Sequence, residues 1–547
     1  MITFSQHFAF KPKLIECLKG YDRATFMADL LSGLTVGIVA LPLAMAFAIA
    51  SGVKPEAGIF TAIIAGFIIS ALGGSRVQIG GPTGAFIVIV YGIVAKYGLA
   101  NLLICTFMAG CILLALGVLR LGVLIKFVPM PVVIGFTNGI AVLIFMSQIK
   151  DFLGLQTGPL PAEFFAQIHT LSSALYTIDW PTVATASASL LLLILWPKAL
   201  NKRIPAPVAV LVLGGLAAAF LHLPVETIGS RFGGIPQTLP HFSAPDLSLE
   251  HLRDLVAPAI TIALLGGIES LLCAVVADGM IKDKHDANQE LIAQGIANIV
   301  VPFFGGIPAT GAIARTSTNI RNGGRTPVAG MIHAVTLLIV ILAAAPLAKH
   351  IPLACLSAIL IIVAVHMGDW SQFKTMHRYS RGRMGTLLST FVLTVVFDLT
   401  VAVEVGILSA SLVLIRRLTQ VTMVTRARHL DHDKLPAGVV IYEARGVLFF
   451  GAADTLEVLS RNRDYGTRVM ILDLDYVIYM DSTAVNALEG AYFDLQARGI
   501  QLLVCGAHQQ PASLIRRSGL LDGMGRHQLP ADRAAALEQA RELTAPA

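Results

Sequence analysis

The chain is short of charged residues. Only 14% of its 547 residues are Asp, Glu, Lys or Arg, whereas 55% are hydrophobic and the mean hydropathy is +0.74. A soluble protein carries roughly a quarter charged residues, so this composition excludes an ordinary soluble protein and indicates an integral membrane protein. The apolar excess ends near Gln420, and the remaining segment to Ala547 has the interspersed charges of a soluble domain.

Cysteine pairs, a leader sequence and a basic patch are also missing. The six cysteines are scattered without a C-x-x-C pair, which leaves a metal site or a disulfide framework without support. Residues 1–23 hold no short apolar run before a cleavage site, so we expect no cleavable signal peptide. The net charge of +6 comes from short basic loops, which does not favour nucleic-acid binding. We expect no cofactor, no metal and no nucleic-acid partner.

Long apolar runs are abundant and divide into candidate membrane-spanning segments. A spanning helix needs about 20 apolar residues, or fewer where it is broken or buried in protein. The fourteen candidates are 30–50, 57–72, 83–95, 99–119, 129–148, 182–197, 205–221, 255–277, 291–302, 311–320, 327–346, 351–368, 384–397 and 399–416. They predict a cytoplasmic segment over 1–25 and a transporter domain over 26–418, with repeat one over about 26–222 and repeat two over about 250–418.

The basic residues of the loops predict the orientation of the chain. One alternating set of loops is rich in Lys and Arg, whereas the opposite set holds only Lys54, Lys96, Lys150, Arg231, Arg253 and Lys349. Loops rich in Lys and Arg stay in the cytoplasm. We therefore expect a multi-pass protein of the cell's inner membrane with both termini in the cytoplasm.

A short phrase occurs twice, at the third position of each half. Residues 82–86 read Pro-Thr-Gly-Ala-Phe and residues 310–313 read Thr-Gly-Ala-Ile, each after a Gly-Gly pair and each opening a short segment. Seven segments per half place the two copies in opposite orientation, and broken helices of inverted repeats meet near the midplane in many transporters. Because first-turn N–H groups lack partners and carry the positive end of the dipole, we predict an anion site there. The donors would be the N–H groups of Gly84, Ala85, Phe86, Gly311, Ala312 and Ile313. The alternative is a chance match among small residues that pack helices.

Two ionisable side chains fall within apolar segments. Glu269 lies deep inside 255–277, where a lone carboxylate is costly, so we interpret it as a carrier of H+ or a ligand of Na+. The alternative for Glu269 is an ion pair with a buried Lys or Arg. Arg315 lies one helical turn past Gly311, where it would add positive potential to the anion site; the alternative is an arginine that extends to the cytoplasmic surface. Pro42 interrupts the first segment, with Leu43 and Phe47 on the following turn.

Together these motifs resemble those of the SulP (sulfate permease) family of anion transporters and channels. The resemblance rests on Ala40-Leu41-Pro42, on Gly81-Pro82-Thr83-Gly84, and on the runs 264–272 and 308–316. The tail resembles the STAS domain that follows the membrane part in that family, through residues 446–451 and 479–484. The likeness covers almost the whole chain.

The resemblance implies two inverted seven-span repeats, arranged as a core domain that moves against a gate domain, and a homodimer. It also implies that span eight supplies the coupling position, here Glu269, with Cys273 one turn later where sodium-coupled bicarbonate members resembling this chain have Thr. A thiol is a poor ligand for Na+, which favours H+ coupling, although Ser270 or backbone carbonyls would still complete a sodium site. The anion position implied by the family corresponds here to Leu43, Phe47, Thr83, Gly84, Ala85, Ala312, Ile313 and Arg315.

The tail predicts a linker over 419–437 and an α/β STAS domain over 438–547. Strands are expected at 439–442 and 446–450, joined by a hairpin, and at 469–474 and 502–505, with helices between and after them. Asp481 or Ser482 would cap the second helix. In stand-alone STAS relatives the position matching Thr483 is phosphorylated, so Thr483 is a candidate modification site. No nucleophile and base occur together, and a cytoplasmic regulator is the expected partner of this domain.

We therefore expect a secondary active transporter and not an enzyme. The leading hypothesis is H+ symport of a small anion, such as sulfate, bicarbonate or a C4-dicarboxylate, by alternating access. The alternatives are a Na+-coupled bicarbonate symporter, an anion channel, exchanger or voltage-responsive motor of the same fold, and a nucleobase–proton symporter. The STAS-like tail and Arg315 disfavour the last of these. A backbone cradle recognises charge and size, so the sequence leaves the identity of the anion open.

Overall fold

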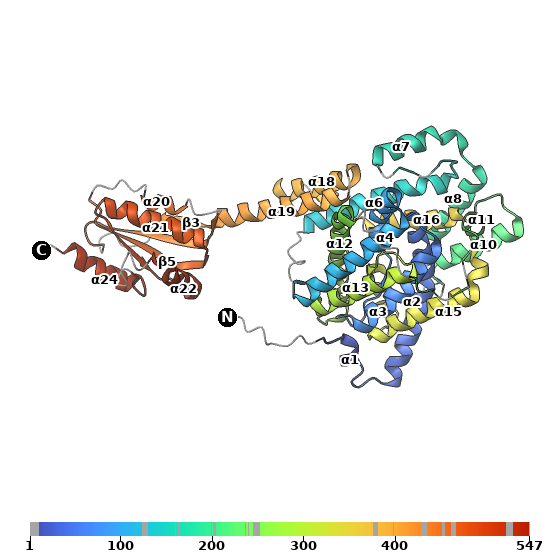
Figure 1. Cartoon of the computed structure of the whole chain (residues 1–547), viewed down its shortest axis with the longest axis horizontal. Coiled ribbons are helices and arrows are strands. Elements are labelled where there is room, and N and C mark those ends of the chain that lie inside the picture. Colours follow the sequence, from blue (N-terminus) through green and yellow to red (C-terminus); the bar gives the residue numbers. More distant parts are fainter. Residues whose placement is uncertain are drawn as a thin grey trace. The chain divides into compact units, whose positions relative to one another are not determined.

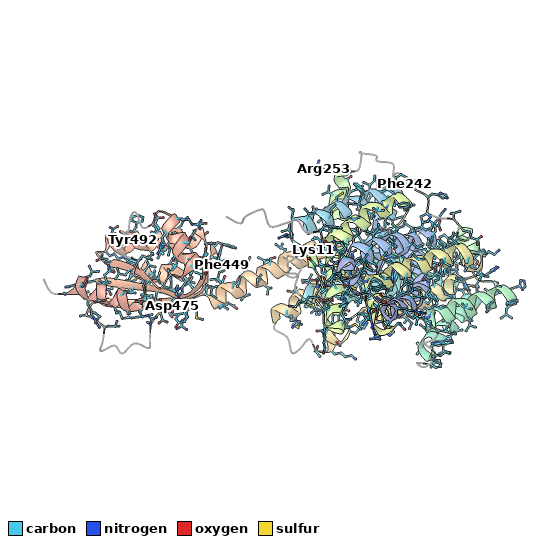
Figure 2. The ribbon with its side chains drawn as sticks, turned by 90° about the horizontal axis from the view of Figure 1, so that it is seen from below. Lys11, Phe242, Arg253, Phe449, Asp475 and Tyr492 are labelled. Atoms are coloured by element: carbon cyan, nitrogen blue, oxygen red, sulfur yellow. The ribbon has the colours of Figure 1, made fainter. Side chains whose placement is uncertain are left out.

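The structure is a computed structural model that describes most of the chain (Figure 1). The described residues are 10–122, 130–158, 160–161, 163–197, 200, 204–235, 237–238, 240–243, 252–375, 381–397, 399–427, 435–450, 455–460, 466–520 and 529–545. The chain forms two compact units, Met1–Ile407 and Leu408–Ala547. Side chains fill the interior of each unit (Figure 2). The boundary between the units falls within one helix, α19 (Leu399–Val421).

Apolar helices build the first unit. The first half of the chain contributes α2 (Arg23–Ala50), α3 (Pro55–Leu72), α4 (Ile87–Val118), α6 (Met130–Leu153), α8 (Trp180–Leu195) and α10 (Ala206–Leu221). The second half contributes α12 (Leu252–Ile281), α13 (Ala287–Val300), α14 (Ile313–Arg321), α15 (Pro327–Ala348), α16 (Leu353–Met367) and α18 (Arg381–Val396). In the described part of the chain, seven helices are long and apolar enough to cross a membrane, and three shorter ones are also apolar.

Each of the predicted segments falls on a helix, but two of them share one. Segments 83–95 and 99–119 are joined in α4, which bends at Gly98, where φ is +84°. Glycine adopts this backbone conformation without steric cost, so the chain changes direction without a loop. The number of membrane crossings stays a prediction.

The helices of the first unit pack as two groups. α2, α3, α4, α12, α13, α14 and α15 contact one another, and α6, α8, α10, α16 and α18 form the second group. Glycines allow the closest approaches: a Cβ added to Gly110 of α4 would meet the backbone of Ile299 in α13, and one added to Gly295 of α13 would meet Leu114 of α4. Each group draws helices from both halves of the sequence, as the predicted core and gate domains require.

Two very short strands join the halves inside the first helix group. β1 (Gly80–Gly81) pairs antiparallel with β2 (Thr310–Gly311), so that Gly80 lies opposite Gly311. β1 leads into the 3₁₀ turn η1 (Gly84–Phe86) and then α4, while β2 leads into α14. This pairing brings the two copies of the repeated phrase side by side.

The second unit contains a four-stranded sheet in the order β3-β4-β5-β6. β3 (Met423–Arg426) pairs antiparallel with β4 (Val439–Leu448), whereas β4 with β5 (Val469–Met480) and β5 with β6 (Gln501–Cys505) are parallel. Alternate residues of β5 face opposite sides. Met470 and Leu472 pack in one core with Leu488 of α21 (Ser482–Ala497), and Ile471 packs with Ala536 of α24 (Arg533–Thr544). Helices therefore cover both faces of the sheet, with α20 (Glu457–Ser460) and α22 (Gln509–Arg517) completing the unit.

Two expectations for the tail need correction. The predicted hairpin near residues 443–445 is wrong, because 439–448 is a single strand with irregular register at Glu443 and Gly446. Gly446, with φ +95°, accommodates this bulge and so resembles a turn signal in the sequence. The structure also places β3 inside the predicted linker 419–437, so the sheet begins before residue 438; residues 428–434 of that linker lie outside the described residues. Asp481 caps α21 as expected, since its side chain accepts from the Ala484 N–H at 2.9 Å.

Candidate anion-binding site

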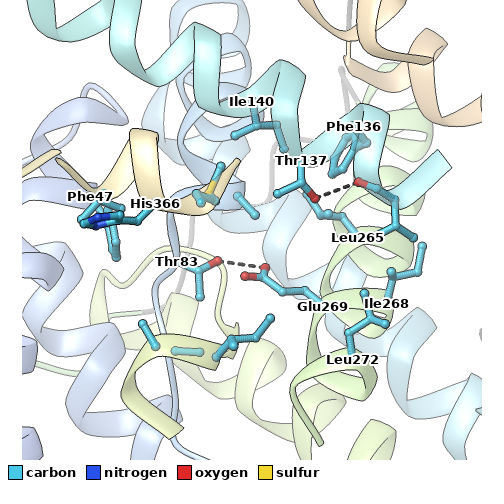
Figure 3. A pocket seen from close by; sticks show the side chains of 18 of the residues that line it. Phe47, Thr83, Phe136, Thr137, Ile140, Leu265, Ile268, Glu269, Leu272 and His366 are labelled. Atoms are coloured by element: carbon cyan, nitrogen blue, oxygen red, sulfur yellow. Dashed lines mark hydrogen bonds between the residues drawn. The ribbon is translucent and has the colours of Figure 1, made fainter. Parts of the chain in front are cut away.

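A cavity of about 500 Å³ lies between the two helix groups of the first unit. One wall is formed by α2, by α12 and by two helix starts, residues 83–85 before α4 and residues 312–315 at the start of α14. Side chains from α6 and α16 form the other wall (Figure 3). Most of the lining is apolar. Its polar side chains, among the described residues, are those of Thr83, Thr137, Glu269, Arg315 and His366.

The first helix start offers its backbone to this cavity. Thr83 is extended, and the turn that follows it contains a hydrogen bond from the Phe86 N–H to the Thr83 carbonyl at 3.3 Å. The N–H groups of Gly84 and Ala85 lie at the very start of the helix, so no carbonyl of the helix accepts a hydrogen bond from them. Gly84 has no side chain to cover them, and a Cβ there would touch Met367 Sδ across the cavity at 3.4 Å. An anion in the cavity can therefore approach these amides.

The second helix start is built differently, which corrects the predicted set of donors. The Ala312 N–H donates to the Ile79 carbonyl at 2.8 Å, as part of the pairing between β1 and β2. Ala312 is thus occupied as a donor, and Gly311 belongs to the strand. The unpaired first-turn amides of α14 begin at Ile313 and continue with Ala314 and Arg315. The unpaired N–H groups of the second helix start are therefore those of residues 313–315, two residues farther along the chain than the predicted set 311–313.

Glu269 of α12 faces the two helix starts. Its Oε2 accepts a hydrogen bond from the Thr83 hydroxyl at 3.0 Å, and the two side chains point toward each other in Figure 3. No Lys or Arg nitrogen of the described residues lies within 4 Å of the carboxylate, so Glu269 forms no direct ion pair, although the charge of buried Arg315 acts on it at longer range. An unpaired carboxylate in such surroundings is costly unless a proton or a cation compensates it.

Arg315 lies in the first turn of α14, and no carboxylate of the described residues contacts its charge directly. Its side chain is 2% exposed, and Nη2 donates to the carbonyl of Pro82. Nη1 has no hydrogen-bond partner among the described residues. Gly81 makes room for the guanidinium, because a Cβ at that position would collide with Nη1. The burial rules out an arginine that extends to the surface and leaves a positive charge beside the cavity.

Most of the predicted site residues meet in this one place. The cavity is lined by nine of them, Leu43, Phe47, Thr83, Gly84, Ala85, Glu269, Ala312, Ile313 and Arg315. Phe86, Gly311 and Cys273 are not part of the lining. Phe86 packs against Gly266 of α12, whereas Cys273 directs its thiol to the Thr316 hydroxyl at 3.2 Å. Glu269 and Cys273 therefore do not share a ligand position.

The second wall of the cavity was not predicted. It consists of Val132, Val133, Phe136, Thr137 and Ile140 of α6 and of Val363, His366 and Met367 of α16. Apolar residues in a spanning helix look the same in sequence whether they face lipid, core or cavity. His366 and Thr137 are polar residues in largely apolar segments, but Asn138, Gln148 and Ser357 are also polar there, so polarity alone does not single out the cavity lining. Thr137 donates to the Val133 carbonyl of its own helix at 2.8 Å.

No cluster of three or more His, Cys, Asp or Glu that would hold a metal ion occurs in the part of the chain that the structure describes. The cavity thus combines backbone amides, one buried guanidinium and one carboxyl group in an apolar setting. These groups suit a small anion that binds together with a proton.

Comparisons with known proteins agree with these features. The family model of the Sulfate permease family matches residues 26–390, and that of the STAS domain matches residues 434–534. The chain is 44% identical over 513 residues to "Putative sulfate transporter YvdB" of Bacillus subtilis (strain 168), which covers 93% of this chain and 96% of that protein. It is 32% identical over 507 residues to "Bicarbonate transporter BicA" of Picosynechococcus sp., covering 88% of this chain and 89% of that protein.

Solved structures show the same fold. The transmembrane domain of a cyanobacterium bicarbonate transporter BicA matches with a TM-score of 0.63 and 31% identity, over 72% of this chain and 98% of that one. Murine Solute Carrier 26 family member A9 matches with a TM-score of 0.87 over 97% of this chain and 94% of that one. The identity to the murine protein is 20%, so this likeness concerns the fold alone.

Proposed function

The chain belongs to the sulfate permease family, and from this premise we propose that it is a secondary active transporter that carries a small anion together with H+. Membership makes it a multi-pass membrane anion transporter with a STAS domain, and not an enzyme. One observation carries the finer proposal: the Glu269 carboxyl group lies in the same cavity as the two helix starts and Arg315.

The coupling follows from electrostatics inside this cavity. An ionised Glu269 would repel an anion held by the amides of Gly84 and Ile313, and the apolar lining would strengthen this repulsion. A proton on Glu269 removes the repulsion, so the anion and the proton favour each other's binding and are reciprocally linked. A transporter that changes its facing direction only when both are bound, or when both are absent, performs symport. Thr83 holds the carboxyl group at the helix start through their hydrogen bond.

Sodium coupling is the second candidate, and the geometry around Cys273 disfavours it. A sodium site at Glu269 would need further hard oxygen ligands. The thiol one turn later is directed to Thr316, outside the cavity lining. The Thr83 hydroxyl is the only side-chain oxygen bonded to Glu269 among the described residues. An anion channel or exchanger of the same fold remains an alternative in which Glu269 would not be coupled to transport.

The substrate class is a small anion such as sulfate, bicarbonate or a C4-dicarboxylate. The names of the relatives point to sulfate and to bicarbonate. The cradle is made mainly of backbone amides, which recognise charge and size and not a particular side group. These three anions are therefore the substrates to test first.

Uptake into proteoliposomes tests the proposal. Labelled sulfate, bicarbonate and fumarate are each offered with an imposed pH gradient, with an imposed Na+ gradient, or with neither. We expect the pH gradient to drive accumulation. Glu269→Gln should abolish that accumulation and leave counterflow exchange intact, because a neutral amide mimics the protonated carboxyl group. Glu16→Gln, at a side chain 70% exposed outside the cavity, is the matched control. Accumulation by Glu269→Gln, or accumulation driven only by Na+, contradicts H+ symport.

The arrangement in the cell is part of the same proposal. We expect a homodimer in the inner membrane with both termini in the cytoplasm and the STAS domain open to a regulator. Thr483 is exposed in the first turn of α21, where its hydroxyl is accessible to a kinase. Phosphate analysis of the purified chain and of Thr483→Ala tests this modification.

A further inference from the structure

A second cavity of about 500 Å³ lies farther along the helices that line the first. α6 lines the first cavity with residues 132–140 and the second with residues 143–151. α2 likewise contributes Leu43 and Phe47 to the first cavity, and Ile49 and Ala50 to the second. The two cavities therefore follow each other along the same boundary between the helix groups.

Packed apolar side chains separate the two cavities. Phe47 is 6% exposed, and Ile140 and Ile144 are fully buried. Gly84 lies against this layer, since a Cβ there would come within 3.5 Å of Ile144 and 3.6 Å of Phe47. We expect an anion to pass from one cavity to the other when the two helix groups move relative to each other and open this layer.

The second cavity holds a lysine, Lys150, that forms no ion pair within 4 Å in the described part of the chain. Nζ of Lys150 donates to the carbonyls of Thr157 and Gly158 at 2.9 and 3.0 Å. No carboxylate of the described residues lies within 4 Å of this ammonium group. The carboxylate nearest in sequence, Asp151, is bonded to Arg231 at 2.9 Å. Asp151 and Arg231 also line the cavity and pair with each other, whereas Glu226, which is not part of the lining, lies 3.7 Å from Arg231. Lys150 is therefore the charged group of the lining that no described carboxylate contacts directly, although Asp151 and Glu226 act on it at longer range.

We propose that this second cavity is an outer anion site, in which Lys150 binds the transported anion on the side of the membrane opposite to the cytoplasm. The inference rests on the proposed function, and the side follows from the predicted orientation, in which Lys150 belongs to the loops poor in Lys and Arg. The ligand class is a small inorganic oxyanion or a carboxylate. Gln148 and Gln167, which are 4% and 6% exposed, supply amide groups to the same lining.

Described residues of the loop after α6 line this site, namely Thr157, Gly158, Leu160 and Pro161. The loop is held to α6 through Lys150 and to α4 through the Tyr91 hydroxyl, which donates to the Leu160 carbonyl. α4 and α6 belong to different helix groups, so the Tyr91 bond joins the groups at the rim of the cavity. A purely structural role for Lys150, as a tether of this loop, is the competing explanation that the experiments must separate.

The charge of the cavity can be measured without any transport. Ser147 lines the cavity, so Ser147→Cys in a Cys111→Ser background provides a thiol within it. Its reaction rates with a sulfonate-bearing and a trimethylammonium-bearing methanethiosulfonate reagent are compared in the full chain. We expect the anionic reagent to be favoured, and Lys150→Gln to lower the ratio of the two rates about fivefold, an effect that salt screens. Lys54→Gln, at a lysine outside the cavity, should leave the ratio unchanged. An unchanged ratio in Lys150→Gln overturns the proposal.

Transport from each side gives the second test. For anion offered on the side that an impermeant thiol reagent reaches at Ser147→Cys, Lys150→Gln should raise KM about fivefold. KM from the other side and kcat should stay the same, and Lys150→Arg should restore KM. Equal loss of kcat from both sides without rescue by Arg would assign Lys150 to the loop tether and overturn the anion site. If the wild-type chain carries none of the anions, the proposed function fails, while the reagent ratio still tests the charge of the cavity.

Discussion

The membrane unit buries Arg315 and the STAS unit holds the partly exposed Arg533, and the two units compensate these charges in different ways. Arg533 of the STAS unit donates to Asp473 at 2.6 Å and to Glu443 at 2.5 Å. Arg315 of the membrane unit donates to one carbonyl, that of Pro82, and keeps Nη1 unpartnered among the described residues. Arg315 is 2% exposed, so it has even less water than Arg533 to compensate its charge.

We interpret this difference as one between a structural charge and a functional one. A charge that carboxylates neutralise ties elements together, and the partly exposed Arg533 joins α24 to β4 and β5 in this way. A buried charge without a fixed counterion persists only if the structure gains something else from it. In the membrane unit Glu269 acts on Arg315 only at longer range, and we expect the transported anion to be the counterion in direct contact.

Replacing Arg315 should have the largest effect. Arg315→Gln removes the positive charge next to the helix starts, and a charge-assisted hydrogen bond contributes about 1.5–3 kcal/mol, so kcat/KM for the anion should fall by about 100-fold. Arg315→Lys should recover part of the loss. Arg321→Gln, at an exposed arginine in the last turn of the same helix, is the control. If Arg315→Gln transports like the control, Arg315 is structural in the same sense as Arg533.

Arg533→Met should instead destabilise the STAS unit without a direct effect on anion affinity. It leaves Asp473, which is 3% exposed, without its guanidinium partner. We expect the free energy of opening of this unit to fall by about 2 kcal/mol, less than for a fully buried pair because Arg533 is partly exposed. Hydrogen exchange of the β4 and β5 amides in the full chain measures the change. Arg541→Met, at an exposed site on α24, should change it by less than about 0.5 kcal/mol. An equal effect of Arg533→Met and Arg541→Met would contradict the structural role of Arg533.

For the membrane unit, the sequence alone predicts most of the features that form the site. Apolar runs locate the helices because spanning segments need length and hydropathy, and the doubled phrase locates the helix starts because Pro and Gly interrupt those runs. Glu269 and Arg315 are recognisable because charge is rare at membrane depth. These features predict where an anion would bind.

The finer geometry depends on contacts that no periodic pattern reveals. β1 and β2 are two residues long, too short for an alternating pattern, yet their pairing occupies the Ala312 N–H and shifts the cradle toward Ile313. The orientation of Phe86 toward Gly266 depends on a helix from the other half of the chain. In the STAS unit, Arg533 lies far in sequence from Asp473 and Glu443, so their pairing is also a product of the fold.

Gly81→Ala tests how the membrane unit positions its arginine. Gly81 has φ +148°, which glycine tolerates better than alanine, and a Cβ there would displace the Arg315 guanidinium. Backbone strain of this kind costs about 1–3 kcal/mol, so we expect kcat/KM to fall roughly tenfold, less than for loss of the charge itself. Gly92→Ala, whose Cβ would meet no atom within 4 Å, is the control. Uptake rates over a range of anion concentrations measure both variants. Unchanged uptake by Gly81→Ala would show that the position of Arg315 is not critical.

The pH dependence of the STAS unit should show the smallest effect. Burial opposes ionisation of Glu443, but hydrogen bonds from Arg445 and Arg533 outweigh it and hold the pKa of this carboxyl below its usual value. Because the folded pKa lies below the unfolded value of about 4.3, ionised Glu443 stabilises the fold above that pH, and this contribution is lost as the pH falls through the folded pKa. Partial exposure limits it to less than about 1 kcal/mol.

Comparing the wild-type chain with Glu443→Gln isolates this contribution. At pH 7 the wild-type STAS unit should resist hydrogen exchange in β4 and β5 more strongly, and the difference should shrink as the pH falls below about 4.3, because a protonated Glu443 pairs no better with Arg533 than Gln does. Reading both chains at the same pH cancels the intrinsic pH dependence of exchange. A difference that persists undiminished to pH 3 would mean that the shape of the side chain, and not its charge, holds Arg533. In that case the contrast with Arg315 would no longer be one of charge compensation.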